Sequence, residues 1–245
     1  LLHRGRASGG NGKDLWKPPL ATGMLSVTDG DRLREIRLDR PAKRNALTRD
    51  GLDRLREAVE SATQPIVYVH GAGDAFCAGA DLETVDGLDG ETGEAFARRG
   101  QATMNAIEDA NAVAVAGVDG PARGGGVELA LACDVRVCTP RATFAETGVT
   151  LGLFGAWGGT RRLRRAVGDA HAADLSLSGR TVGAETAREM GLVSRVVEDP
   201  RTVAEEIAAN DPAALRELKA LLRTDGDRET TDEREAAAFG RLLAE

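Results

Sequence analysis

Apolar and charged residues alternate along residues 33–38, and more weakly along residues 24–27, on either side of the turn sequence Thr28-Asp-Gly-Asp31. Alternation with a period of two is the pattern of a half-buried strand, and a short Asp-Gly turn commonly joins two antiparallel strands. The chain is therefore predicted to open with a β-hairpin.

A helix is predicted next, because Thr48 is a suitable N-cap residue. The apolar residues that follow it fall on one helical face: Leu52, Leu55, Ala58, Val59 and Ala62. Pro65 ends the connection before an apolar run at residues 66–69, which predicts a buried strand.

The same order of strand, loop and helix then recurs. Helices are predicted at roughly residues 92–110 and 126–132, and strands at residues 113–118 and 134–137. Strands that alternate with helices pair in parallel through right-handed crossovers, so the pattern indicates an α/β fold. After Thr160 the pattern is mostly helical, interrupted by a short strand at residues 193–197.

Composition is consistent with one catalytic domain and a helical tail. The chain has 245 residues, 42% of them hydrophobic, and a formal net charge of −7. That charge argues against nucleic acid as a partner, because phosphate backbones require a basic surface. The local exception is Arg161-Arg-Leu-Arg-Arg165, whose helical spacing predicts a solvated helix face, with a subunit contact or a phosphate contact as alternatives.

Cysteine usage and hydropathy bear on location. Cys77, Cys133 and Cys138 form no CxxC pair, and no run of about eighteen apolar residues or cleavable leader is present. We expect reduced thiols, a cytoplasmic location and no membrane association. Residues 1–23 have no periodicity and are expected to be an N-terminal extension, vector-derived or flexible, before a start at Met24.

Two glycine-rich loops carry the candidate chemistry: Gly71-Ala-Gly-Asp-Ala-Phe-Cys-Ala-Gly-Ala-Asp-Leu82 and Asp119-Gly-Pro-Ala-Arg-Gly-Gly-Gly-Val-Glu-Leu-Ala130. Each follows an apolar run and leads toward a helix. Glycine allows a ligand to approach the main chain, and a helix start provides N–H groups without internal partners. Such loops can stabilise negative charge on an oxygen. A dinucleotide-binding GxGxxG motif is excluded, because its last glycine position is Phe76.

With these loops, the chain from about Met24 to its C-terminus resembles the crotonase, or enoyl-CoA hydratase/isomerase, superfamily. The resemblance implies a crotonase-like spiral of ββα units with a C-terminal helical region. Residues 24–190 would form the catalytic core and residues 191–245 the helical region used for assembly, as a homotrimer or a dimer of trimers. It also implies a coenzyme A thioester as the substrate, with no further cofactor and no metal.

The resemblance assigns roles in both loops. The peptide N–H groups of Ala80 and Gly125 would polarise the thioester carbonyl, and the carbonyl of Ala78 would meet the adenine amino group of CoA, with Asp81 in the same CoA-binding segment. The loop Arg40-Pro-Ala-Lys-Arg-Asn-Ala46 would lie beside the nucleotide part of CoA. Lys43 and Arg44 would then contact phosphates, unless they are ordinary exposed charges.

Glu128 is predicted in the first turn of a helix, where the macrodipole favours a carboxylate. It could activate water or move a proton, or it could serve only as a capping acid. The resemblance makes it one of two catalytic glutamates.

The second glutamate of the family is missing, because alignment of Phe144-Ala-Glu-Thr-Gly-Val-Thr-Leu-Gly152 with the family segment places Gly148 at that position. Replacing Gly148 with Glu would restore the pattern and is expected to raise activity. Glu146 stands two residues earlier, displaced by roughly 6.6 Å in an extended chain. It is either a catalytic acid in a reshaped loop or a solvated loop acid.

These assignments favour reversible hydration of 2-enoyl-CoA. The alternatives are an enoyl-CoA isomerase, another thioester-enolate enzyme such as a hydrolase or decarboxylase, and a non-catalytic acyl-CoA-binding subunit. Phe154 and Trp157 are interpreted either as walls of an acyl pocket or as core residues.

Overall fold

The computed structural model describes residues 23–224 and 226–244. Within them, the main sheet has six strands in the order β1-β2-β3-β4-β6-β9, and a second sheet has three in the order β5-β7-β8. The strands are β1 (Leu25–Asp29), β2 (Leu33–Leu38), β3 (Ile66–Gly71), β4 (Val113–Val118), β5 (Pro121–Arg123), β6 (Val135–Cys138), β7 (Thr143–Ala145), β8 (Val182–Gly183) and β9 (Arg195–Val196).

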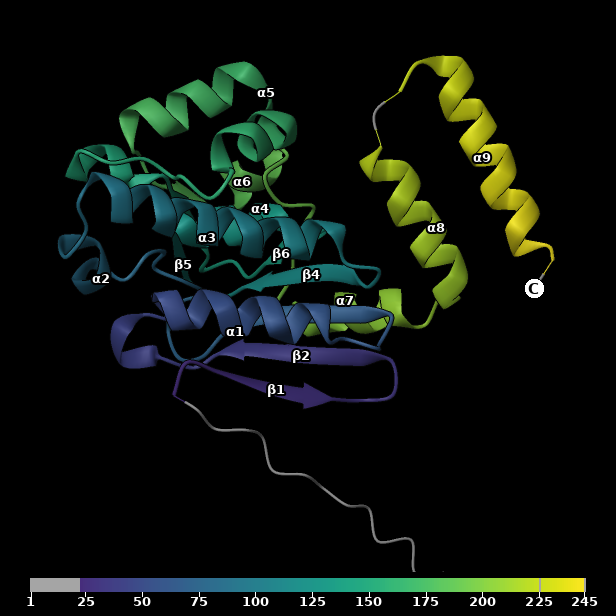
Figure 1. Ribbon diagram of the computed structural model, residues 1–245, viewed down its shortest axis with the longest axis horizontal. Helices are drawn as coiled ribbons and strands as arrows, with labels where there is room; N and C mark the ends of the chain where they lie inside the picture. Colours follow the sequence, from purple (N-terminus) through teal and green to yellow (C-terminus); the bar gives the residue numbers. More distant parts are fainter. Residues whose placement is uncertain (1–22, 225, 245) are drawn as a thin grey trace, which may run out of the picture.

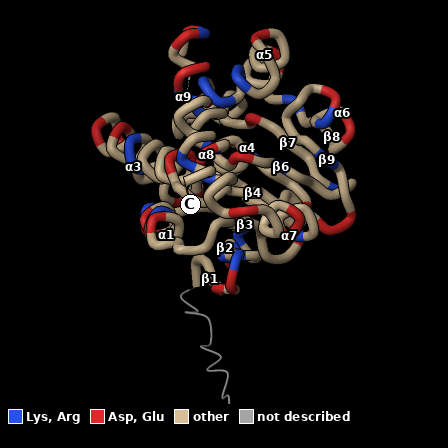
Figure 2. Tube along the Cα trace, turned by 90° about the vertical axis from the view of Figure 1, so that its right-hand side faces the viewer, with Lys and Arg blue, Asp and Glu red and all other residues tan. Residues whose placement is uncertain are grey.

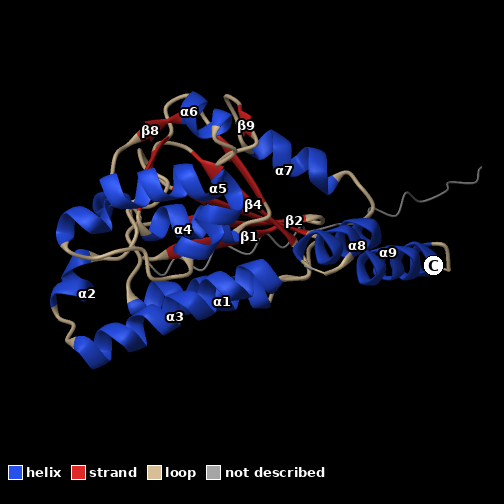
Figure 3. Cartoon of the chain, turned by 90° about the horizontal axis from the view of Figure 1, so that it is seen from above, coloured by secondary structure: helices blue, strands red, loops and turns tan. Residues whose placement is uncertain are grey.

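Helices surround both sheets, and the last two, α8 and α9, form a hairpin that projects from the body of the molecule (Figure 1, Figure 3). The α-helices are α1 (Arg49–Glu60), α2 (Leu82–Asp86), α3 (Gly90–Asp109), α4 (Gly125–Ala132), α5 (Gly159–Ser178), α6 (Ala184–Glu189), α7 (Arg201–Ala208), α8 (Pro212–Arg223) and α9 (Arg228–Leu242), with 3₁₀ helices η1 (Pro41–Lys43) and η2 (Thr147–Leu151). No helix in the described part of the chain is long and apolar enough to cross a membrane.

The predicted hairpin is confirmed. β1 pairs antiparallel with β2, from Leu25 opposite Leu38 to Asp29 opposite Arg34. The predicted parallel pairing is confirmed as well, because β2–β3, β3–β4 and β4–β6 are all parallel. Thr48 caps α1 as expected, accepting a hydrogen bond from the Gly51 N–H at 3.2 Å, although the helix ends before Ala62. The extension predicted at residues 1–23 lies outside the described residues, apart from residue 23.

The ββα units give the α/β fold its form. β1–β2–α1, β4–β5–α4 and β6–β7–α5 each run through two strands into a helix. The remaining unit begins with β3 and leads to α2 and α3. Its second strand is reduced to an isolated bridge between Cys77 and Ala122. The strands of the second sheet have two or three residues each, which is too short to show a period in the sequence.

The two faces of the main sheet contribute to two apolar clusters. In β3, Val67 and Val69 pack into the larger cluster, whereas Ile66 and Tyr68 pack into the smaller one with residues of α7. This alternation is the period of two that a strand imposes. The two clusters cover both faces of the parallel strands, as such strands require.

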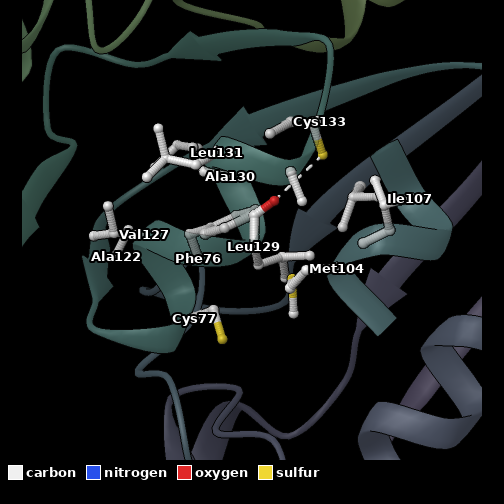
Figure 4. Packing of buried hydrophobic residues seen from close by; sticks show 14 of the residues in the cluster. Phe76, Cys77, Met104, Ile107, Ala122, Val127, Leu129, Ala130, Leu131 and Cys133 are labelled. Carbon is white, nitrogen blue, oxygen red and sulfur yellow. Dashed lines mark hydrogen bonds between the residues drawn. The ribbon is translucent and has the colours of Figure 1, made fainter. Parts of the chain in front are cut away.

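The larger cluster supports α4, and all eight residues of this helix are buried. Phe76 and Leu129 lie against Met104 and Ile107 of α3, and the Cys133 thiol donates to the Leu129 carbonyl at 3.5 Å (Figure 4). All three cysteines are free and buried. The second glycine-rich loop is therefore attached to a helix that packing fixes from every side.

The arginine-rich segment of α5 is in large part the predicted solvated face, because Arg161, Arg164 and Arg165 are exposed. Arg162 is buried, and together with Arg161 and Arg223 of α8 it forms ion pairs with Glu108 of α3. These pairs hold the pKa of Glu108 to about 2, against the effect of its partial burial. In Figure 2, acidic and basic positions are interspersed along the visible trace.

Candidate active site

The first glycine-rich loop presents the Ala80 N–H away from the neighbouring chain. Leu47 pairs with Ala80 as an isolated parallel bridge, in which the Leu47 N–H donates to the Gly79 carbonyl at 2.8 Å and the Asp81 N–H donates to the Leu47 carbonyl at 2.9 Å. In parallel pairing, the residue between two such bonds directs its own N–H to the other side. Accordingly, the Ala80 N–H donates to no other residue that the structure describes.

The second loop presents the Gly125 N–H at the start of α4. Gly124 is the N-cap, with φ +46°, and its carbonyl accepts from the N–H groups of Val127 and Glu128 at 2.8 and 3.1 Å. Gly125 is the first helical residue, so its N–H has no partner within the helix. The helix start therefore leaves a second donor available.

Gly79 brings the two loops into contact. Its φ is +86°, and a Cβ at this position would lie 2.8 Å from the Gly125 nitrogen and 2.6 Å from the Arg123 carbonyl oxygen. Only glycine satisfies both the backbone conformation and this close approach. Ala80 and Gly125 consequently line one cavity of about 400 Å³, which Ala78 and Glu128 also line.

Glu128 binds the start of a different helix instead of capping its own. Its Oε1 accepts hydrogen bonds from the main-chain N–H groups of Trp157 at 2.8 Å and Gly159 at 2.7 Å, where α5 begins. The residue is only 1% exposed. Burial raises the pKa of Glu128 to about 7, against the lowering effect of these two bonds and of Arg162. Desolvation therefore outweighs the effect of the helix dipole, which was expected to favour the ionised form of Glu128.

Glu146 is buried, so its interpretation as a solvated loop acid is wrong. It follows β7 and is 8% exposed, and its Oε1 has no hydrogen-bond partner among the described residues. Its Oε2 lies 3.0 Å from the point where a Cβ of Gly155 would stand, and the Glu128 carboxyl carbon lies 2.9 Å from the same point. Burial, and then the charge of Glu128, raises the pKa of Glu146 to about 8.

Gly148 lies at a close crossing of two backbone segments. A Cβ on Gly148 would be 2.9 Å from the Phe154 Cα and 3.1 Å from the Phe154 nitrogen. The Gly148 carbonyl also accepts a hydrogen bond from the Leu153 N–H at 2.9 Å. Residues 147–151 form η2, so the extended geometry assumed for the spacing of residues 146 and 148 does not apply.

Trp157 forms part of the cavity wall and of the core at once. Its ring packs directly on two glycines. A Cβ on Gly100 would lie 2.0 Å from the ring and a Cβ on Gly125 would lie 2.3 Å from it, so neither position has room for a side chain. It packs edge-on against Phe96, with ring centroids 5.8 Å apart. Phe154 also lines the cavity but is 73% exposed, so the interpretation of Phe154 as a core residue is wrong.

The charged residues predicted to contact CoA lie outside the cavity wall. Lys43 pairs with Glu83 at 2.5 Å on the surface, and the Arg44 carbonyl accepts the Ala78 N–H at 2.9 Å. The Asp81 carboxylate is occupied by Arg40 at 2.9 Å and by the Thr84 N–H at 3.2 Å, where it caps α2. The side chain of Asp81 therefore holds the loop in place, and Ala78 alone of these four residues lines the cavity.

Asn45 is a loop-positioning residue that the sequence argument missed. It has φ +58°, its Oδ1 accepts the Arg40 N–H, and its amide nitrogen contacts the carbonyls of Ala72 (2.9 Å), Ala75 (2.7 Å) and Phe76 (3.2 Å). Asn is one of the few residues that tolerate the left-handed region, which was the available signal. Among the described residues, no group of His, Cys, Asp and Glu is arranged to hold a metal ion.

Comparison with known proteins agrees with this arrangement. The sequence profile of the enoyl-CoA hydratase/isomerase family matches residues 29–240. The crotonyl-CoA hydratase of Syntrophomonas wolfei is 33% identical over 229 residues, which cover 87% of each chain. The protein therefore belongs to the enoyl-CoA hydratase/isomerase family.

Solved structures give the same result for the fold. An enoyl-CoA hydratase from Bacillus anthracis superimposes with a TM-score of 0.85 at 31% identity, covering 91% of this chain and 92% of the other. A protein described as a putative enoyl-CoA hydratase from Thermobifida fusca, solved in complex with acetoacetyl-CoA, gives a TM-score of 0.83 at 29% identity, with 92% and 96% covered. The predicted crotonase-like fold is confirmed.

Proposed function

We propose that the protein catalyses the reversible addition of water to 2-enoyl-CoA thioesters, giving 3-hydroxyacyl-CoA. One observation carries the proposal: the cavity that Ala80 and Gly125 line with available N–H groups is also lined by the buried carboxyl group of Glu128. The family match and the named hydratases among its relatives support the same reaction.

The two N–H groups would stabilise the enolate. As the oxygen of water forms a bond to Cβ, the electron pair of the C=C bond moves through Cα to the thioester oxygen. Two preorganised main-chain donors stabilise the negative charge there, and their contribution is large in a site that excludes water. The start of α4 adds its positive dipole end at Gly125.

Glu128 would act as the base in this reaction. Its carboxylate takes the proton from the attacking water, and Glu128 then returns that proton to Cα to complete the addition. A pKa of about 7 allows Glu128 both to accept and to return a proton near neutral pH. The two N–H groups that bind its Oε1 fix the orientation of the carboxylate.

The charge of Glu128 would help to keep Glu146 protonated. Glu146 does not line the cavity, but its carboxyl group stands beside that of Glu128 across Gly155. Two adjacent buried carboxyl groups do not ionise together readily, so the pair keeps one proton near neutrality. Glu146 is the member that stays neutral, because two main-chain N–H groups stabilise a charge on Glu128, whereas the Glu146 Oε1 has no donor among the described residues. We assign it as a positioning residue.

The CoA moiety and the assembly complete the proposal. Lys43 and Arg44 would contact phosphates outside the cavity, and the Ala78 carbonyl would meet the adenine amino group. Contact of Lys43 with a phosphate would require its ion pair with Glu83 to open or to widen. The projecting α8–α9 hairpin leaves Leu218, Leu222, Phe239 and Leu243 exposed, which supports its use in assembly as a homotrimer or a dimer of trimers.

An enoyl-CoA isomerase is the second candidate, and Gly148 favours it. Conversion of a 3-enoyl-CoA to a 2-enoyl-CoA needs only one carboxylate, which moves a proton from Cα to Cγ. Glu128 lines the cavity, whereas the position of the family's second glutamate carries no side chain. The same oxyanion donors would serve this reaction.

Product mass, together with the absorbance of the conjugated 2-enoyl thioester, separates the candidates. The purified protein is incubated with 2-hexenoyl-CoA and, separately, with 3-hexenoyl-CoA. A hydratase adds the mass of one water to the first substrate. An isomerase converts the second substrate to the first at unchanged mass. Absence of both reactions, with CoA thioesters still bound, would contradict both proposals and identify a binding subunit.

A further inference from the structure

The side chains that line the cavity are mostly apolar. They include Phe96 and Trp157 at its buried side, and apolar side chains of α2, of the α2–α3 connection and of residues 151–154: Leu82, Val85, Leu88, Leu151, Leu153 and Phe154. Among the residues that line it, only Asp89 and Glu128 carry a charge, and none is a Lys, Arg or His. Asp89 is already bound to Thr92 at the start of α3.

Four of these apolar side chains are exposed although they face a cavity. Leu82 is 56% exposed, Leu151 58%, Leu153 46% and Phe154 73%. They lie on two segments that line this cavity, the start of α2 and residues 151–154, which run from the end of η2 into the following loop. A contiguous group of exposed apolar residues beside a cavity marks a surface that a ligand covers.

Gly148 shapes the loop that carries three of them. Its close packing on the Phe154 backbone and the bond from the Leu153 N–H to its carbonyl fold residues 148–154 tightly together. Any side chain at position 148 would push this loop outward. Glycine at position 148, in place of the family's second acid, therefore allows the tight fold that places Leu151, Leu153 and Phe154 along the cavity.

We propose that this cavity selects an uncharged aliphatic acyl group longer than four carbons, whose distal carbons cover Leu82, Leu151 and Phe154. The proposal rests on the acyl-CoA function above, since the thioester would be held at Ala80 and Gly125. An acyl group that ends in a carboxylate is disfavoured, because the wall offers no cation to offset its desolvation.

Binding of unreactive ligands tests this separately from catalysis. Dissociation constants are measured by calorimetry for butyryl-, octanoyl- and dodecanoyl-CoA, and for glutaryl-CoA against pentanoyl-CoA. Each buried methylene is expected to tighten binding about fourfold until the chain leaves the wall, so octanoyl-CoA should bind at least about tenfold tighter than butyryl-CoA. Glutaryl-CoA should bind at least about tenfold more weakly than pentanoyl-CoA.

Leu151→Ser should lower the preference for octanoyl- over butyryl-CoA by about threefold or more. Leu177→Ser is the matched control, because Leu177 is 77% exposed on α5 and does not line the cavity. Equal dissociation constants for butyryl- and octanoyl-CoA would overturn the proposal. It would also be overturned if Leu151→Ser reduced the molar mass in light scattering and left the preference intact, since the surface would then be a subunit contact. Failure of the hydration assay leaves these constants measurable, so the two proposals fail separately.

Discussion

Glu128 and Glu146 bring their carboxyl groups to the same glycine. The Glu128 carboxyl carbon and the Glu146 Oε2 lie 2.9 and 3.0 Å from the position of a Cβ on Gly155. Glu128 has two main-chain donors at its Oε1, whereas the Glu146 Oε1 has no partner in the described chain. Two adjacent acids with such different surroundings are expected to hold different protonation states, and this governs the first predictions.

Glu128→Gln removes the proposed base while keeping the size of the side chain. Hydration should fall by about a hundredfold or more, the usual effect of losing a positioned acid–base group. The dissociation constant of an acyl-CoA should change little, because the donors at Ala80 and Gly125 remain. Glu91→Gln, at an exposed site in the first turn of α3, is the control. Unchanged turnover in Glu128→Gln would remove Glu128 from the mechanism.

The pH profile of kcat/KM should be bell-shaped, with limbs near pH 7 and pH 8. Ionisation of Glu128 creates the base and gives the rising limb, and ionisation of Glu146 places a second charge beside it and gives the falling limb. Glu146→Gln keeps this side chain neutral, so the falling limb should disappear while turnover at pH 7 persists. A hundredfold loss at every pH would instead mean that Glu146 delivers the proton itself.

Stability should fall as the pH rises. The folded-state pKa values of Glu128 and Glu146 lie above the ordinary value of 4.5, so the native state binds more protons than the unfolded state between pH 4.5 and about 8. Below pH 4.5 both groups are neutral in the folded and the unfolded state. Their contribution to the free energy of unfolding is fully present there, and it is lost as the pH rises from 4.5 to about 8. Glu146→Gln should reduce the decline by an amount on the order of a few kcal/mol, measured by urea unfolding at pH 5 and pH 8. An identical decline in both proteins would contradict the raised pKa of Glu146.

Gly148→Glu should lower stability and activity, contrary to the expectation from the family pattern. The new Cβ would lie 2.9 Å from the Phe154 Cα, which forces the backbone at residues 153–154 to move. We expect a loss of about 1–3 kcal/mol in the free energy of unfolding, typical of an overpacked site. Gly90→Glu is the control, since a Cβ there meets no atom within 4 Å. Higher hydratase activity in Gly148→Glu would show that the loop adapts.

Asn45→Asp should destabilise the first glycine-rich loop. The substitution keeps the shape, the tolerance of a positive φ and the acceptor for the Arg40 N–H, but it replaces the amide donor that three carbonyls surround. A carboxylate oxygen facing carbonyl oxygens should lower the free energy of unfolding by roughly 2 kcal/mol or more. Activity should fall too, because the segment that holds Ala80 loosens. Wild-type stability would mean that Asn45 does not hold the loop.

Local patterns in the sequence were sufficient for most of the framework. The alternation at residues 33–38, the apolar run at residues 113–118 and the N-cap at Thr48 were each found in the structure. These features depend on neighbouring residues, so the sequence records them directly. The helix expected from residue 92 begins at Gly90, because Asp89 and Thr92 form a reciprocal capping box. The two loops were recognisable since glycine has a backbone freedom that other residues lack.

The protonation and shape of the site depended on tertiary contacts. Glu146 was open to two interpretations in the sequence, and the fold buries it with Gly155 beside its carboxyl group. Glu128 has a raised pKa because α4 is enclosed by the core, whereas its position in a first turn predicted the opposite. Gly148 looked like a lost acid, and the fold places it against Phe154. Desolvation and close packing arise from segments distant in the chain, which no local pattern encodes.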